Sequence, residues 1–284
     1  MSQKKITVYS SDVDNHSISW HLRTIIKDFN QSHELGFRLF KRNLKAQYRQ
    51  SMLGFGWAIL HPLITACLWI FLNRSNVVSV ADTGSSYPIF VITGTILWQV
   101  FTESILAPLT QISENKSILT KINIPREGLL LSGAYQLVFN TIIKILILVV
   151  IYLFFGETIR MPKLAFIPIG IFAISLTGFS IGLALTPLGM LYQDINRGLG
   201  ILLPILMYLT PVVYPAPQDG TFGFLIKLNP VATLLTQTRN WFTNQPTYDM
   251  PLFWALTLFF GILFFLSLII YRISMPMIIE RIGT

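Results

Sequence analysis

Long runs of uncharged, mainly apolar residues constrain the fold of this chain more than any other feature. Six such runs cover residues 55–72, 87–109, 128–155, 164–192, 198–216 and 251–271. A helix needs about 20 apolar residues to cross the hydrocarbon layer of a bilayer. Only 12% of the residues are charged, whereas soluble domains carry about 25%. In lipid, only helices and closed β-barrels satisfy the backbone polar groups. Because the runs lack the strict alternation of apolar and polar residues that barrel strands show, we predict helices. We therefore predict an all-α integral membrane protein with six transmembrane helices.

The distribution of basic residues predicts how these helices are oriented. An even number of spans places both termini on one side, and fifteen of the 21 basic residues fall on that side. Four fall on the opposite side, with Arg74 at a boundary and Lys144 inside a run. The positive-inside rule then makes both termini cytoplasmic. This asymmetry and anionic lipid account for most of the net charge of +8, so nucleic acid is not an expected partner.

The region after the fifth run suggests short helices on the outer face. The fifth run itself contains Pro204 and Pro211, and segment 215–250 follows it. Within that segment, the apolar stretch 222–235 is too short to span and is broken by Asn229-Pro230. Such a stretch favours a re-entrant or interfacial helical hairpin; an ordinary outer loop is the alternative.

Residues 33–52 predict an amphipathic helix before the first span. At about 100° per residue, its apolar and basic side chains fall on neighbouring arcs. The apolar arc holds Phe37, Phe40, Leu44 and Tyr48, and the basic arc holds Arg38, Lys41, Arg42, Lys45 and Arg49. This pattern is typical of a helix that lies in the membrane interface. The helix either anchors the chain to the membrane or also holds a phosphate-bearing substrate.

The predicted organisation therefore has three parts. Residues 1–32 form a cytoplasmic N-terminal extension, 33–52 the interface helix and 53–284 the six-helix transmembrane domain. Within the last part, 110–127 is a cytoplasmic loop and 215–250 the outer segment. Residues 1–28 lack the apolar core of a signal peptide.

The sequence does not support an enzyme. It contains no phosphate-binding G-x-x-x-x-G-K-[ST] motif, no G-x-S-x-G and no H-E-x-x-H. The single cysteine, Cys67, and the scattered histidines predict no metal site. Glu103 and Lys144 are the only Asp, Glu, Lys or Arg residues inside the runs. Counted along their helices, they lie about 8 and 22 Å from the inner end, so we expect no direct pair; each is either a structural contact or a proton-coupling group.

A known family shares the motifs of this chain. Run 39–63, LFKRNLKAQYRQSMLGFGWAILHPL, resembles the approach to the first span in ABC-2 type permeases that export lipid-linked polysaccharide such as O-antigen, capsule or teichoic acid. Further matches follow in the family's order: Tyr87-Pro88, Gly94, Trp98, 115–127, 192–194, 211–215, Asn229-Pro230 and Arg239. The resemblance covers about residues 35–280. Asn43 stands where the family commonly has Asp, and Gln47 where it often has Arg.

The resemblance implies partners that the sequence alone does not show. Such permeases form homodimers in the bacterial cytoplasmic membrane and bind two copies of a separate ATPase, so no cofactor is expected in this chain and ATP and Mg belong to the partner. Loop 110–127 then holds the coupling helix that docks on the ATPase. Its candidate residues are Asn115, Lys121, Pro125, Arg126 and Glu127. A solvated connecting loop is the alternative.

The resemblance also implies a polyprenyl-linked glycan as substrate. Its diphosphate would be recruited by the basic residues Arg38, Arg42, Lys45 and Arg49. Trp57, Trp69 and Tyr208 are candidate pore-lining residues, since aromatic faces bind the apolar surfaces of sugars; membrane-interface belts are their alternative role.

Three other function classes stay open at this point. An ABC-2 exporter of drugs or small lipids shares the six-helix plan. A proton-driven secondary transporter would use Glu103 and Lys144. A membrane-bound glycosyl- or acyltransferase would need an acid–base constellation that is not evident in the sequence.

Overall fold

The structure is a computed structural model, and all of the regular structure in the residues that it describes is helical. These residues are 18–49, 52, 56–75, 83–116, 119, 125–157, 161–216, 220–247 and 249–283. The helices are α1 (Ile18–Arg49), α2 (Gly56–Arg74), α3 (Tyr87–Glu114), α5 (Arg126–Phe155), α6 (Met161–Leu164), α7 (Phe166–Leu191), α8 (Asp194–Tyr208), α9 (Gly220–Leu228), α10 (Pro230–Phe242) and α11 (Met250–Gly283).

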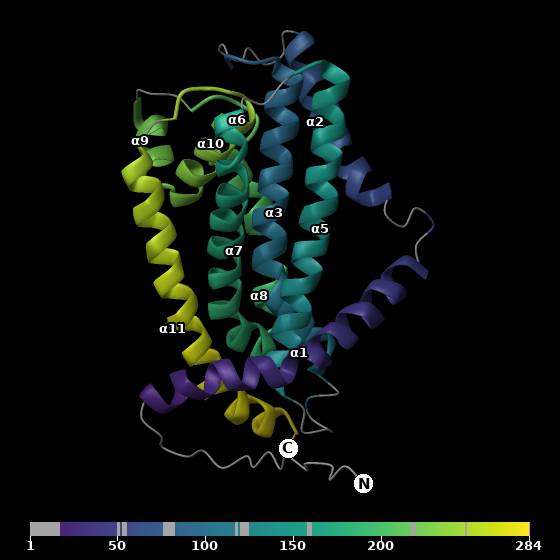
Figure 1. Cartoon of the computed structure of the whole chain (residues 1–284), viewed down its shortest axis with the longest axis vertical. Coiled ribbons are helices and arrows are strands. Elements are labelled where there is room, and N and C mark those ends of the chain that lie inside the picture. Colours follow the sequence, from purple (N-terminus) through teal and green to yellow (C-terminus); the bar gives the residue numbers. More distant parts are fainter. Residues whose placement is uncertain are drawn as a thin grey trace.

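Four long helices, α3, α5, α7 and α11, run side by side (Figure 1). These four are long and apolar enough to cross a membrane. Helix α1 lies across one end of the bundle, near the C-terminal end of α11, and α6, α9 and α10 lie at the opposite end (Figure 1). The prediction of an all-helical, multi-pass membrane protein is confirmed. Helix α1 begins at Ile18, within the segment predicted as an N-terminal extension.

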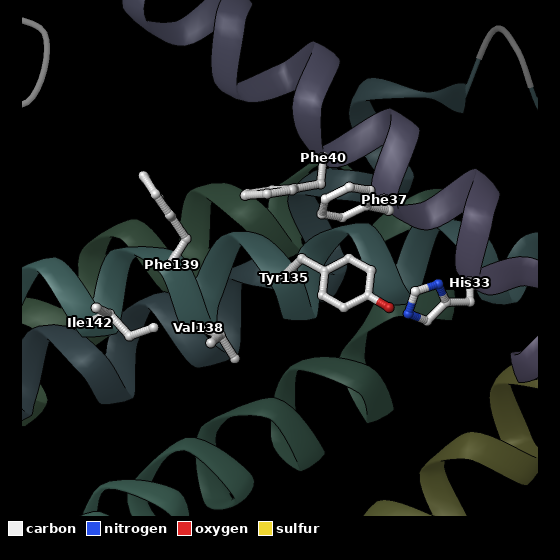
Figure 2. Close-up of a pocket in the computed structure, with 7 residues that line it drawn as sticks. All are labelled: His33, Phe37, Phe40, Tyr135, Val138, Phe139 and Ile142. Carbon is white, nitrogen blue, oxygen red and sulfur yellow. The ribbon is translucent and has the colours of Figure 1, made fainter.

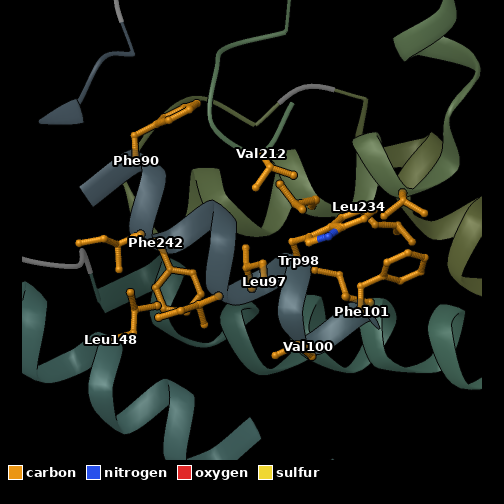
Figure 3. Packing of buried hydrophobic residues seen from close by; sticks show 14 of the residues in the cluster. Phe90, Leu97, Trp98, Val100, Phe101, Leu148, Val212, Leu234 and Phe242 are labelled. Carbon is orange, nitrogen blue, oxygen red and sulfur yellow. The ribbon is translucent and has the colours of Figure 1, made fainter. Parts of the chain in front are cut away.

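Helix α3 is the centre of the bundle, and most of its side chains are buried. Its closest neighbour is α7, whose Gly178 and Gly182 lie against the α3 backbone. A Cβ atom on Gly182 would lie 2.1 Å from the carbonyl oxygen of Ile105, and one on Gly178 would lie 2.6 Å from that of Phe101. Small residues four positions apart let two helices in a membrane approach closely, which maximises their van der Waals contact. Phe90, Trp98 and Phe101 of α3 join the adjoining buried cluster (Figure 3).

The prediction of a fifth span over residues 198–216 is wrong for its second half, because the helix ends at Tyr208. Helix α8 has 15 residues, so it reaches about 22 Å. The chain then turns irregularly, with Val212 N–H donating to the carbonyl of Thr210 at 2.7 Å. The sequence carries a reason for the break, because Pro211 has no N–H to continue a helical ladder. Helices α9 and α10 follow and meet at Asn229-Pro230, where the Asn229 side chain accepts from Val231 N–H at 3.0 Å.

A buried arginine fixes this irregular segment. Arg239 of α10 donates from Nη1 to the carbonyl oxygens of Pro211, at 2.8 Å, and Val212, at 3.0 Å. Its guanidinium also stacks 3.7 Å from the Phe90 ring centre. Burial lowers the pKa of Arg239 to about 9, which still leaves the side chain charged at neutral pH. Two carbonyl groups of the non-helical segment after α8 are therefore satisfied by a side chain 27 or more residues away.

The same segment crosses α3 at Gly94, where a larger side chain would not fit. A Cβ atom at position 94 would lie 2.1 Å from the Val212 carbonyl oxygen and 3.3 Å from Arg239 Nη1. Replacing Gly94 with Ala should therefore lower the free energy of unfolding by about 1–3 kcal/mol, measured by thermal unfolding in detergent. Gly261→Ala is the matched control, because the nearest atom to its added Cβ is 4.0 Å away. That variant should be neutral or more stable by up to about 1 kcal/mol; equal destabilisation of both variants would contradict the proposed contact.

Candidate functional site

A network of polar side chains joins α1 to the end of α3. Arg42 Nη2 donates to Asn115 Oδ1 at 2.8 Å, and Asn43 Nδ2 donates to Gln111 Oε1 at 2.9 Å. Asn115 Nδ2 in turn donates to the Gln111 carbonyl at 2.7 Å. Asn115 and Gln111 are both buried, so these bonds are shielded from competing water. The network fixes the last turn of α3 against α1.

A second set of contacts fixes the start of α5. Pro125 is the residue before the helix, and Glu127 lies in its first turn. Glu127 Oε1 is 3.9 Å from Arg272 Nε of α11, with both side chains largely buried. The Tyr271 hydroxyl, also from α11, donates to the Arg126 carbonyl at 3.3 Å. Helix α11 therefore holds α5 where the chain enters the bundle.

These two sets of contacts lie near the two ends of the predicted coupling loop, 110–127, whose first five residues belong to α3. Asn115 anchors the chain before the loop, and 125–127 anchor it afterwards. Lys121 and its neighbours 120–124 lie outside the described residues. A force on this loop would act directly on α3 and α5, and through their hydrogen bonds on α1 and α11.

The four predicted phosphate ligands are not equivalent in the structure. Arg42 is engaged with Asn115 and with Asn43 Oδ1, at 3.1–3.2 Å. Arg38 Nη2 lies 2.5 Å from Glu34 Oε1 of the preceding turn, and both side chains are about three-quarters exposed. Lys45 and Arg49 are exposed along the same helix. Arg38, Lys45 and Arg49 therefore face solvent or a membrane surface, while Arg42 is partly a structural residue.

The three predicted pore residues separate into a pair and a single residue. Trp69 of α2 and Tyr208 of α8 lie with ring centres 6.4 Å apart. Trp57 lies at the other end of α2 and is exposed. Both helices carry exposed apolar stripes, which comprise Trp57, Leu60, Ile64, Leu68 and Phe71 on α2 and Ile201, Leu202, Ile205 and Tyr208 on α8.

The prediction that Glu103 and Lys144 do not pair is wrong. Lys144 Nζ forms a salt bridge with Glu103 Oε1, and the two side chains are 3% and 37% exposed. Helix α3 continues to Glu114, so Glu103 lies about 16 Å from its end, farther than predicted. The helices are antiparallel, and helical side chains lean toward the N-terminus of their own helix. Glu103 therefore leans away from the α1 end while Lys144 leans toward it, and the remaining gap closes.

Several residues of this site were not predicted from the sequence. Gln111, Tyr271 and Arg272 are polar positions at or beyond the ends of apolar runs, which is the signal that could have identified them. Asn43 and Gln47 differ from the family's usual charged residues, and each bonds to a glutamine of a neighbouring helix. Asn43 donates to Gln111, and Gln136 Nε2 donates to Gln47 Oε1 at 3.0 Å. Among the described residues, no group of three or more His, Cys, Asp or Glu side chains could hold a metal ion.

Comparison with known proteins identifies the family. The model for the ABC-2 type transporter family matches residues 35–243. The chain belongs to this family. ABC-2 relatives include the O-antigen export system permease protein RfbA of Klebsiella pneumoniae, 26% identical over 204 residues, which are 72% of this chain and 78% of the relative. The protein of the same name from Myxococcus xanthus is 24% identical over 219 residues, 75% of this chain and 81% of the relative. The resemblance drawn from the motifs is confirmed.

The ion pair between the buried Lys144 and the partly exposed Glu103 of this ABC-2 chain yields a double-mutant prediction. Breaking a buried pair leaves an uncompensated charge and costs about 3–5 kcal/mol, whereas replacing both partners by apolar residues is often neutral. Glu103→Met should destabilise more than Lys144→Met, because it strands the more deeply buried charge. The double variant should unfold closer to the wild-type temperature than either single variant. Additive losses in thermal unfolding would show that the two side chains act independently.

Proposed function

We propose that this chain is the permease subunit of an ATP-driven ABC exporter that moves a lipid-linked polysaccharide across the bacterial cytoplasmic membrane. Family membership and two relatives named as O-antigen export permeases support this substrate class over drugs or small lipids. The observation that carries the mechanism is the loop held at both ends, at Asn115 and at 125–127. In this proposal α2 and α8 complete a six-span domain with both termini in the cytoplasm.

The predicted three-part organisation enters this proposal with one adjustment. Residues 53–284 form the transmembrane domain, and α1 is the interface helix, although it starts before residue 33. Helices α9 and α10 form the re-entrant pair on the outer face. Asn229 and Arg239 support a fixed pair there, because both bond to the segment that follows α8.

The energy source in this proposal is a separate ATPase that binds two copies of the permease. The chain has no nucleotide-binding motif, so ATP and Mg are assigned to the partner. The loop between α3 and α5 docks on that ATPase. Asn115, Pro125, Arg126 and Glu127 transmit its displacement to the bundle, with Lys121 in the docking element itself. Such a step shifts the permease between states that ATP binding stabilises differently.

Removing the Asn115 anchor should uncouple the loop from the bundle. Asn115→Ala takes away the acceptor of Arg42 and should leave co-purification with the ATPase intact while reducing substrate-stimulated ATP hydrolysis about fivefold or more, since buried charge-assisted hydrogen bonds contribute about 1.5–3 kcal/mol. Asn140→Ala, at a half-buried position of α5, is the control and should behave as wild type. A wild-type permease that captures no ATPase would refute the proposed function, and normal stimulation in Asn115→Ala would refute the anchor.

Two copies of the chain would form the conduit through α2 and α8. Both helices expose apolar side chains along one stripe, and α8 packs only lightly on α7 and α3. A short, weakly packed span gains stability when a second copy covers it. The contact between Trp69 and Tyr208 places aromatic rings where the two helices meet, and such rings suit the apolar faces of sugars. The exposed Trp57 would then lie near one end of the same path.

The basic side chains of α1 would recruit the diphosphate of a polyprenyl-linked glycan. Each basic side chain near an anionic surface contributes about 1 kcal/mol, so the proposed set of Arg38, Arg42, Lys45 and Arg49 acts collectively. Because Arg42 also anchors Asn115, its substitution would mix recruitment with coupling.

A triple substitution separates recruitment from coupling. Replacing Arg38, Lys45 and Arg49 with Gln should reduce polysaccharide export by about tenfold or more while the complex with the ATPase still assembles. Export is measured in cells as surface polysaccharide, and assembly by co-purification. Lys227→Gln, on exposed α9 at the other end of the bundle, is the control. Undiminished export in the triple variant would leave these residues with membrane anchoring only.

A further inference from the structure

An aromatic groove lies between α1 and α5 and is not used by the proposed mechanism. It has a volume of about 330 Å³. Phe37 and Phe40 line it from α1, and Tyr135, Val138 and Ile142 line it from α5 (Figure 2). Tyr135 lies at its centre, with ring contacts of 6.0 Å to Phe37 and 6.2 Å to Phe40. Almost all of the lining surface is carbon.

The groove exists because the two helices approach most closely at small residues, and larger side chains bridge them on either side of this contact. A Cβ atom on Gly36 of α1 would lie 2.8 Å from Leu131 Cβ and 3.0 Å from the carbonyl oxygen of Gly128, both on α5. Helix α1 lies across the end of α5 rather than along it (Figure 1). Farther along α5 the two helices are linked through long side chains: the Phe40 and Phe139 ring centres are 5.9 Å apart, and Gln136 Nε2 donates to Gln47 Oε1 at 3.0 Å. Rings therefore line a wedge between the helices that they do not fill.

The groove continues into an apolar surface along α5. Val138 and Ile142 are exposed, and the stripe extends through Leu146, Val150 and Leu153 toward the far end of the helix. Because α5 is long and apolar enough to span the membrane, this stripe faces hydrocarbon. A hydrocarbon chain lying along α5 would reach the groove at its α1 end without crossing any polar surface.

A cation lies at the edge of the groove. The Lys41 ammonium is 4.7 Å from the centre of the Phe37 ring, and the Lys41 side chain is exposed. Within the described part of the chain, no carboxylate lies within ion-pair distance of Lys41, while the nearby Glu34 is paired with Arg38. The groove is therefore an apolar slot with a positive charge at its edge. A bilayer carries its phosphates at this level.

We propose that this groove binds one hydrocarbon chain of an anionic phospholipid from the leaflet on the α1 side, with the lipid phosphate held by Lys41. The occupied wedge fixes the angle between α1 and α5. Helix α1 carries Arg42 and Asn43, which hold the end of α3, so the lipid steadies the anchor of the coupling loop. The binding itself follows from the groove and does not depend on the proposed function.

Native mass spectrometry of the purified full chain, titrated with phosphatidylglycerol or with phosphatidylethanolamine of the same acyl chains, tests the site. Phosphatidylglycerol should occupy one site per chain, about fivefold more tightly than phosphatidylethanolamine. Val138→Trp fills the groove from an exposed position and should weaken phosphatidylglycerol binding about tenfold or more. Val150→Trp places the same ring about 18 Å farther along the same exposed stripe and should leave binding unchanged.

Lys41→Gln isolates the headgroup contact. It should bring phosphatidylglycerol down to the affinity of phosphatidylethanolamine, while Lys227→Gln should not. Equal binding by Val138→Trp and Val150→Trp would overturn the groove, and an unchanged lipid preference in Lys41→Gln would overturn the phosphate contact. A polyprenyl phosphate that displaces phosphatidylglycerol at equimolar concentration would assign the groove to a transport substrate and overturn the phospholipid proposal. These measurements need neither ATPase nor export, so their failure leaves the proposed function intact.

Discussion

Close contact between helix backbones around α3 is the constraint on which the rest of the structure depends. In a bilayer the lipid tails are as apolar as leucine, so helices associate through van der Waals packing and a few polar contacts. Gly178 and Gly182 bring α7 onto the α3 backbone at two successive turns, and Gly94 lets the segment after α8 do the same. Side chains at these positions would push apart the elements that place Arg239 and Asn115.

Polar contacts are concentrated at the two ends of this packed centre. At one end, Arg239 satisfies carbonyl groups of the irregular segment that follows α8. At the other, Arg42 and Asn43 tie α1 to the end of α3, and Glu127 ties α5 to α11. Between them, the pair of Glu103 and Lys144 joins α3 to α5 inside the apolar layer. This distribution is consistent with the proposal that a partner ATPase acts on one end of the bundle and that the path opens at the other.

The peripheral helices α2 and α8 differ from this centre. Their exposed apolar stripes are not covered within the single chain, so lipid or a partner must cover them. The closely packed centre and the exposed stripes of α2 and α8 are thus separate, which is consistent with the proposal that a second copy covers these stripes.

The sequence by itself determined the class of protein, the positions of the apolar helices and the family. Uncharged runs mark spans because lipid excludes unpaired polar groups, and α5 and α7 begin and end within two residues of the predicted runs. The break at Asn229-Pro230 was likewise visible as a helix boundary. The family's motif was enough to select Asn115, Pro125 and Glu127 as candidates, but it did not reveal which residues they contact.

Only the tertiary structure decided which side chains meet. Counting residues along two helices gives neither their relative depth nor the lean of their side chains, so the pairing of Glu103 with Lys144 was missed. The irregular segment after α8 is held by Arg239, 27 or more positions later in the chain, and local propensity does not contain that contact. For the same reason the aromatic groove was invisible in the sequence: it arises from the angle at which Gly36 lets α1 cross α5, and that angle is a property of two packed helices rather than of either one.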